Sequence, residues 1–254
     1  MTITHLVAVA PYIALHVLTF CAFAAAGAWR DRHRKAGGLG GRSPLLGVAA
    51  FLVIGAIMVA AALLFLPRET LPPGAEAPTA SYRSMNALRQ LAINAAMVAP
   101  FVGWVMWRRQ GLAALGIGKD DALRSLAIGA CVSLACIPIL GRLSMPFWST
   151  PGTWWMLLAM LGVGASEEVI SRGFVLGVLV KRLPRLWAEL GSAALFAIFH
   201  VPQRIGSGMS PEGMAVSLLT LVIFGWCYAA AMRSGRNVPG LALVHAIGNV
   251  CAIS

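Results

Sequence analysis

Acidic residues are scarce in this 254-residue chain, which has nine Asp and Glu against 20 Lys and Arg. All charged residues together make up 11% of the sequence, whereas a soluble domain carries roughly 25%. Such a chain cannot cover its surface with solvated side chains, so a water-soluble monomer is excluded. With 59% hydrophobic residues and a mean hydropathy of +0.79, the composition predicts an integral membrane protein.

Two further absences narrow the class. The five cysteines form no Cys-x-x-Cys pair and lie in apolar stretches, so a disulfide framework or a zinc knuckle is excluded and buried free thiols are expected. The first apolar stretch has no basic residue before it, and Arg30, Arg32, Arg34 and Lys35 follow it instead. A signal peptide has the opposite order, so we expect a retained first helix with its N-terminus outside.

Long apolar stretches fill most of the chain, and a transmembrane helix needs about 20 such residues. We therefore predict an all-α, polytopic membrane protein with about eight transmembrane helices. The predicted spans are 5–28, 44–66, 89–107, 124–142, 153–180, 186–202, 213–232 and 237–253.

The basic residues are distributed unevenly among the loops between these spans. Fourteen of the twenty lie in the odd-numbered loops: Arg30, Arg32, Arg34, Lys35, Arg42, Arg108, Arg109, Lys119, Arg124, Lys181, Arg182, Arg185, Arg233 and Arg236. Five lie in the even-numbered loops: Arg68, Arg83, Arg89, Arg142 and Arg204. Cytoplasmic loops collect basic residues, so we expect the odd loops in the cytoplasm and both termini outside. The basic excess then requires no nucleic acid, and it is compatible with anionic lipid.

Two adjacent acids lie inside a predicted span, Glu167 and Glu168, and Arg172 follows them. Six acids lie in loops, and Glu189 is placed at a helix start near the lipid headgroups. A carboxylate at the bilayer centre costs roughly 2.5–3.5 kcal/mol, which invites a functional explanation. Glu168 and Arg172 are four residues apart and can pair, whereas Glu167 points elsewhere and suits a general base. A purely structural link or a pore gate remains the alternative.

Two histidines lie at a comparable depth. His200 follows Phe196 by one helical turn, and His245 precedes Asn249 by one turn. Imidazole and carboxylate groups can activate water, and an amide can stabilise an oxyanion, as peptide hydrolysis requires. Other intramembrane protease designs do not fit, because the sequence has no His-Glu-x-x-His, no aspartate within a span and no Gly-x-Ser-Gly.

These segments resemble the motifs of a known family. Glu167 to Arg172, Phe196 to His200 and His245 to Asn249 match the patterns EExxxR, FxxxH and HxxxN of the CPBP intramembrane proteases. That family contains the CAAX prenyl endopeptidases and their bacterial relatives, the CAAX amino-terminal protease or Abi family. The resemblance covers about residues 150–254. It implies a catalytic helical core at 146–254, preceded by N-terminal transmembrane helices and loops at 1–145.

The resemblance also implies a role for each residue. Glu167 and His200 would activate the attacking water, and His245 and Asn249 would stabilise the oxyanion. Glu168, Arg172 and Phe196 would support the site. We favour hydrolysis without a cofactor. Zinc is the alternative, and its ligands would then be Glu167, His200 and His245.

The substrate is less defined than the chemistry. The Ala-, Gly-, Val- and Arg-rich composition, with only three lysines, is typical of a GC-rich bacterium, so we expect the bacterial inner membrane. Bacterial relatives are associated with peptide maturation, immunity and membrane-protein turnover. We therefore predict an endopeptidase that acts on membrane-associated proteins or peptides. The alternatives are a non-catalytic membrane partner in immunity or signalling, and a transporter with a proton relay.

Overall fold

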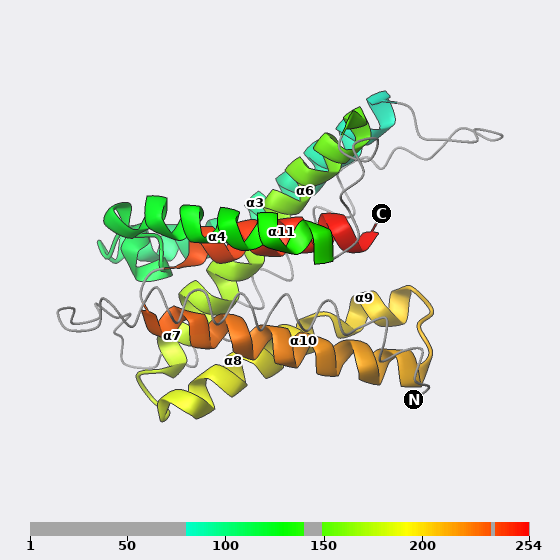
Figure 1. Cartoon of the computed structure of the whole chain (residues 1–254). Coiled ribbons are helices and arrows are strands. Elements are labelled where there is room, and N and C mark those ends of the chain that lie inside the picture. The colour runs from blue at the N-terminus through cyan, green and yellow to red at the C-terminus, as the bar shows by residue number, and fades with distance from the viewer. Residues whose placement is uncertain (1–79, 140–148, 235–236, 254) are drawn as a thin grey trace.

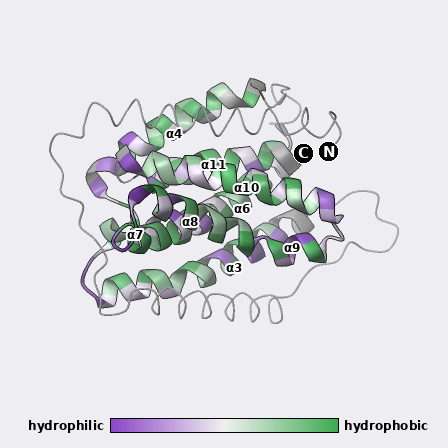
Figure 2. Cartoon of the chain, turned by 90° about the horizontal axis from the view of Figure 1, so that it is seen from below, coloured by the Kyte–Doolittle hydropathy of each residue, from purple (hydrophilic) through white to green (hydrophobic). Residues whose placement is uncertain are grey.

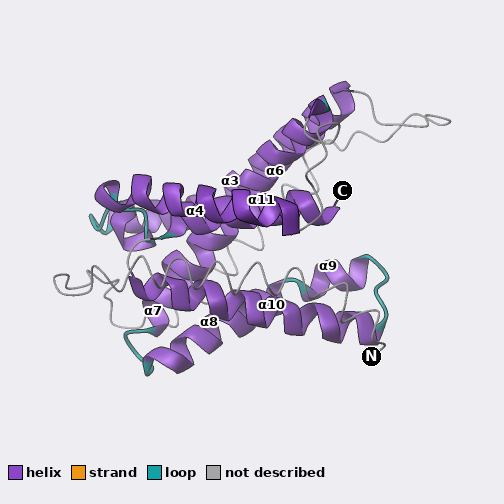
Figure 3. Ribbon diagram, in the orientation of Figure 1, coloured by secondary structure: helices purple, strands orange, loops and turns teal. Residues whose placement is uncertain are grey.

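The computed structural model describes residues 80–139, 149–234 and 237–253 of the chain. Every regular element in these ranges is a helix, which confirms the all-α prediction for this part of the chain (Figure 3). The longer helices are α3 (Ala80–Trp107), α4 (Lys119–Ile139), α6 (Pro151–Glu168), α8 (Arg185–Phe199), α10 (Pro211–Ala231) and α11 (Val238–Ile253). The shorter ones are η1 (Leu112–Leu115), η2 (Val169–Val175), α7 (Leu176–Leu179), α9 (Val201–Gly206) and η3 (Met232–Ser234).

The segments α6, η2 and α7 follow one another without a break and correspond to the predicted span 153–180. Thr150 caps the start of this long helix, because its hydroxyl accepts a hydrogen bond from the Thr153 amide. Pro151 occupies the first helical position, where a missing amide hydrogen costs nothing. Thr150 and Pro151 thus mark the start of the long helix that carries the acidic pair.

The η2 segment is a π-helix that begins directly after Glu168. Its Ser171 carbonyl accepts one hydrogen bond from the Leu176 amide, five residues on, and a second from Ser192 Oγ of α8 at 2.9 Å. Wider turns of this kind are frequently found at functional sites. Here the wide turn fixes α8 to the helix that carries the acidic pair.

The predicted span 186–202 consists of α8 and α9, which meet at His200. The chain stays helical through this residue, because the Arg204 amide bonds the His200 carbonyl at 3.1 Å. The next helix, α10, starts at Pro211, and Ser210 Oγ caps it by accepting from the Gly213 amide at 3.2 Å. Both α8 and α10 lie within two residues of their predicted starts.

Helix α11 packs against both α4 and α6, and all three lie on one side of the molecule (Figure 1). Glycines allow the close approach: a Cβ on Gly240 would lie 2.0 Å from the Ser125 carbonyl oxygen, and one on Gly164 would lie 2.5 Å from that of Ala242. Small residues at such crossings let transmembrane helices pack tightly. The close α6–α11 contact is what places the acidic pair beside α11.

Helix α3 packs along α6, and its Phe101 contacts Phe174 of η2 edge to face, with ring centroids 4.9 Å apart. Both rings are buried in one apolar core together with Leu115 of η1. Two helices from the predicted N-terminal segment, α3 and α4, therefore contact the helices of the predicted catalytic core directly. The boundary between 145 and 146 stays a prediction.

Two described helices are long and apolar enough to cross a membrane, Ser84–Trp107 and Pro211–Ala231, and Val238–Cys251 is a shorter apolar helix. Apolar residues run along the long helices, and hydrophilic residues gather near the start of α4 and beside α7 (Figure 2). These helices support a membrane location. Of the eight predicted spans, 5–28 and 44–66 lie outside the described residues, and the number eight stays a prediction.

Glu189 lies in the second turn of α8, near the helix start where it was predicted, and its side chain is fully buried. Arg233 binds both carboxylate oxygens, and Arg185 Nε lies 2.7 Å from Oε1. The hydrogen bonds that Arg233 donates to Glu189 raise the pKa of Arg233, so the pair stays charged. Since Arg185 begins α8 and Arg233 follows α10, the pairs hold two odd-numbered loops at one end of the protein.

The prediction of buried thiols holds for two of the described cysteines. Cys227 and Cys251 are free and buried. Cys131 is also free, but it is exposed on α4. In a membrane protein an outward-facing residue of a span meets lipid, where a small apolar thiol is tolerated.

Candidate active site

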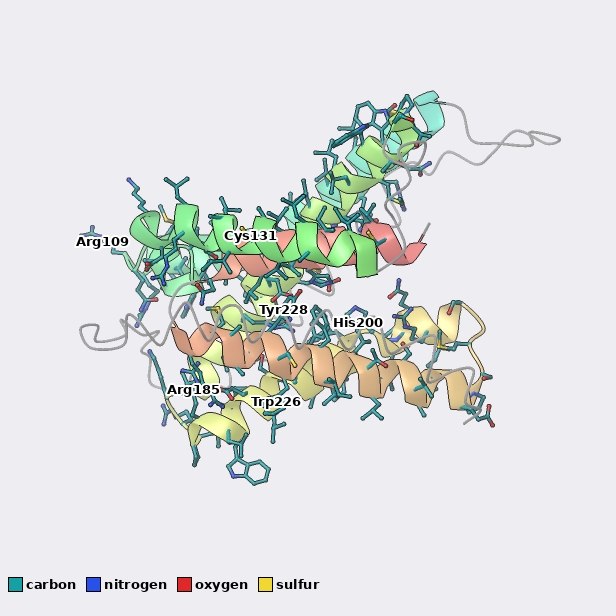
Figure 4. The ribbon with its side chains drawn as sticks, viewed as in Figure 1. Arg109, Cys131, Arg185, His200, Trp226 and Tyr228 are labelled. Carbon is teal, nitrogen blue, oxygen red and sulfur yellow. The ribbon has the colours of Figure 1, made fainter. Side chains whose placement is uncertain are left out.

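Three helices bring the predicted polar residues to one place. Glu167 and Glu168 are the last residues of α6, His200 ends α8, and His245 lies within α11. Glu168 and His245 are 77 positions apart in the sequence and are hydrogen-bonded. Figure 4 shows His200 and Tyr228 between α10 and the α4–α11 pair. The fold thus brings together side chains from the three sequence motifs.

Glu168 forms the centre of a buried chain of interactions. Its Oε1 accepts a hydrogen bond from Arg172 at 3.1 Å and one from His245 Nδ1 at 2.9 Å. Both Glu168 and Arg172 have side chains with 0% exposure. The pair predicted from the four-residue spacing is therefore present, and it reaches further than predicted, because it also orients an imidazole.

Glu167 faces the two histidines. Its Oε2 lies 3.7 Å from His200 Nε2 and 3.6 Å from His245 Nε2. These distances are too long for direct hydrogen bonds and suit a bridging water. The Glu167 side chain is 22% exposed, whereas Glu168 is fully buried. Two adjacent carboxylates therefore have different environments, and only Glu167 can reach a substrate.

The hydrogen bond that Nδ1 makes fixes the tautomer of each imidazole. His200 Nδ1 lies 2.9 Å from the Phe196 carbonyl oxygen, which can only accept, so Nδ1 carries the hydrogen. His245 Nδ1 donates in the same way to the carboxylate of Glu168. When both rings are neutral, their Nε2 lone pairs face Glu167. Three acceptors facing one another require a proton or a hydrogen-bond donor between them.

The two histidines differ in what holds them. His200 is held by a neutral backbone carbonyl, whereas His245 is held by the carboxylate of Glu168, as the histidine of a catalytic triad is held by its acid. With Nδ1 bonded to Glu168, His245 can donate a hydrogen bond from Nε2 only when its ring is protonated.

Asn249 follows His245 by one turn on α11 and is half-buried. Its side chain forms no hydrogen bond with any other residue that the structure describes, so its amide is available to a substrate. Residues four apart share a helix face. Asn249 therefore lies on the face of α11 that carries His245, as its predicted role requires.

Arg172 is surrounded by aromatic rings, and two of them were not predicted. The ring centroids of Phe196, Phe224 and Tyr228 lie 4.4, 5.3 and 5.5 Å from its Cζ. Phe196 belongs to a motif, but Phe224 and Tyr228 are apolar or nearly so in an apolar helix. The one available signal was Tyr228 itself, one of only three tyrosines in the chain.

Ser166 precedes the acidic pair, but its hydroxyl is bound elsewhere. Ser166 Oγ donates to Asn94 Oδ1 of α3 at 2.7 Å and also lies 2.9 Å from the Val163 carbonyl oxygen. Asn94 in turn donates to the Gln90 carbonyl. The serine thus links α3 to α6, which is a structural role, and Asn94 is a further residue that the sequence did not identify.

The donor types of Glu167, His200 and His245 would suit zinc. Among the described residues, no group of three His, Cys, Asp or Glu stands out as a metal site. What the three groups can do as they stand is share protons with a small polar molecule between them.

One comparison with known proteins gives a match. The family model described as type II CAAX prenyl endopeptidase Rce1-like matches residues 148–251, which include all three motifs and the helices α6 to α10 together with most of α11. No curated protein and no solved structure matches the chain. The family consists of peptide hydrolases, in agreement with the resemblance of the motifs. The segment 148–251 therefore belongs to the Rce1-like family of type II CAAX prenyl endopeptidases.

Proposed function

We propose that this protein is an intramembrane endopeptidase that hydrolyses a peptide bond with a water activated by Glu167 and His200. One observation carries the proposal: Glu167 Oε2 faces the Nε2 atoms of both His200 and His245 at 3.7 and 3.6 Å. A water molecule between these groups would donate one hydrogen to the carboxylate and the other to an imidazole.

In the first step the water oxygen attacks the carbonyl carbon of the scissile bond. Glu167 takes the proton from the water, and His200, neutral and held by the Phe196 carbonyl, accepts the second hydrogen bond. The carbonyl π-bond opens, and its oxygen becomes an oxyanion. The protonated His245, paired with Glu168, donates from Nε2 to that oxyanion, and the Asn249 amide donates beside it.

In the second step the tetrahedral intermediate collapses. The carbonyl re-forms, the carbon–nitrogen bond breaks, and Glu167 returns its proton to the leaving nitrogen. The products are a carboxylic acid and an amine, and the side chains regain their starting protonation states. Burial of the cluster favours this cycle, because electrostatic stabilisation is stronger where water is largely excluded.

This route uses no metal. Cleavage by the purified protein should therefore persist after exhaustive chelation. Loss of cleavage on chelation and its recovery with added zinc would favour the zinc-dependent variant, with Glu167, His200 and His245 as ligands.

The location follows from the charge pattern. We propose eight spans in the inner membrane of a bacterium, with the odd loops in the cytoplasm and both termini outside. The Glu189 pairs support this topology, because they bring residues of loops five and seven to the same end. The substrate class is a membrane-associated protein or peptide.

The test compares the termini of membrane peptides in cells that produce the native chain or the Glu167→Ala variant. Peptide termini that depend on Glu167 are expected, and Arg109→Gln, at an exposed residue on the loop before α4, serves as the control that should leave them unchanged. Identical termini in the native and Glu167→Ala cells would contradict the enzymatic function. If the biological effect also persisted, the protein would be a non-catalytic partner.

A further inference from the structure

The guanidinium of Arg172 has few hydrogen bonds for a buried cation. Its NH1 donates to Glu168 Oε1, while Nε and NH2 have no hydrogen-bond partner among the described residues. A guanidinium carries five N–H donors. Most of its polar edge therefore lacks the compensation that a buried charge needs.

Aromatic rings compensate this charge instead. The faces of Phe196 of α8 and of Phe224 and Tyr228 of α10 lie within 6 Å of the Arg172 Cζ. A ring face is negative, so it attracts a cation at this range, most strongly when both are desolvated. The three rings form what we call the aromatic cage, and all three are buried.

Two rings of the cage also contact His245. The Phe224 ring centroid lies 4.8 Å from that of His245, with the planes at 80°, and the Tyr228 centroid lies 6.4 Å away. Phe224 and Tyr228 are one turn apart and contact each other at 4.3 Å. Phe224 and Tyr228, on one face of α10, thus contact both Arg172 and His245, the two residues that bind Glu168.

We propose that Phe224 and Tyr228 are positioning residues for the hydrolysis: their ring faces hold Arg172 against Glu168, and their edges hold the His245 ring against Glu168. The inference deepens the proposed function and rests on it. The two rings touch the groups that orient His245 and do not touch Glu167 in any described contact. Weakening them should therefore lower kcat and leave KM nearly unchanged.

The sharpest test replaces Phe224 with phenylalanines that carry one, two or three ring fluorines. Fluorine draws electron density from the ring face while the ring keeps its size, so a contact made by the ring face weakens stepwise. The probe is a quenched peptide that carries a cleavage site found by the comparison of membrane termini. We expect kcat to fall with each added fluorine, by roughly tenfold over the series.

Phe101 is the matched control. Its ring is as buried as that of Phe224, and it contacts Phe174 edge to face in a different apolar core. The same fluorines at Phe101 should leave kcat unchanged. The unfolding temperature gives a second measurement that needs no substrate, and it should fall stepwise for the Phe224 series.

Two substitutions of Tyr228 distinguish the contribution of its ring from that of its hydroxyl. Tyr228→Phe keeps the ring face and should retain kcat within about twofold, whereas Tyr228→Leu should lower kcat by roughly tenfold. An equal loss in both variants would assign the effect to the hydroxyl and overturn the role of the ring.

The outcomes separate this inference from the proposed function. If Glu167→Ala still cleaves the peptide, the proposed function fails, and the unfolding temperatures alone then report on the cage. If cleavage depends on Glu167 while kcat stays constant across the Phe224 series, the enzyme stands and the positioning role is overturned. A change confined to KM would also overturn it, because it would place Phe224 at the substrate.

Discussion

Glu168 and Glu189 are two buried carboxylates with the same exposure and different partners. Glu189 is bound by Arg185 and Arg233, whose side chains are 42% and 51% exposed. Glu168 is bound by Arg172, which is fully buried, and by His245. In the Glu189 cluster, the partners of the carboxylate are two arginines that also reach solvent. In the Glu168 cluster, the partners are one buried arginine and a histidine.

We interpret the difference as that between a structural clamp, the Glu189 cluster, and the proposed reaction centre, the Glu168 cluster. Arginines stay charged at every pH that proteins experience, so the Glu189 cluster has one state. The Glu168 cluster differs because it contains a histidine, the side chain that proteins use most often to exchange protons. The proposed hydrolysis needs a group that exchanges protons, and Glu167, the proposed base, is the neighbour of Glu168.

Glu168→Gln should have the largest effect of the variants that compare the two clusters. It leaves Arg172 without its carboxylate in a buried place and removes the anion that holds His245. We expect kcat to fall by about 10³-fold and the free energy of unfolding to fall by roughly 3–5 kcal/mol. Cleavage kinetics and thermal unfolding of the purified protein check the two parts. Native kcat with reduced stability would make Glu168 merely structural.

Asn249→Ala should come next. The amide is free of described hydrogen bonds, so the variant should unfold like the native protein. Loss of one oxyanion donor lowers kcat by about 10²–10³-fold, and KM should stay close to its native value. Kinetics across a range of peptide concentrations test this. A kcat within threefold of the native value would remove Asn249 from the oxyanion site.

Glu189→Gln should have the smallest effect on cleavage. Two bonded arginines lose their carboxylate, but both reach solvent, so their charges stay hydrated. We expect a lower unfolding temperature and a kcat within about threefold of native, because α8 carries His200 at its opposite end. If kcat fell as far as in Glu168→Gln, the distinction between clamp and reaction centre would be wrong.

The sequence predicted the acidic pair because acids inside a span are rare and costly. Helix spacing predicted the Glu168–Arg172 pair, and the motifs predicted His200 and His245. The spacing rule works within one helix only. It could not predict that His245 bonds Glu168, because that contact depends on how α11 crosses α6.

The same limit explains what was missed. The pairing of Glu189 was not predicted, since an acid near a helix start needs no partner, and its main partner Arg233 lies 44 residues away. Phe224 and Tyr228 were not predicted, because aromatic residues in an apolar span are expected for burial alone. Their significance lies in what they face, and only the packing of α10 against η2 and α11 reveals it.

The most direct test of the central claim is the cleavage rate of the Glu167→Gln variant in liposomes. The amide keeps the size of the carboxylate and cannot take the proton of water. If Glu167 is the base, kcat should fall by about 10²–10⁴-fold while the unfolding temperature stays native. Cleavage within threefold of the native rate by this folded variant would contradict the account.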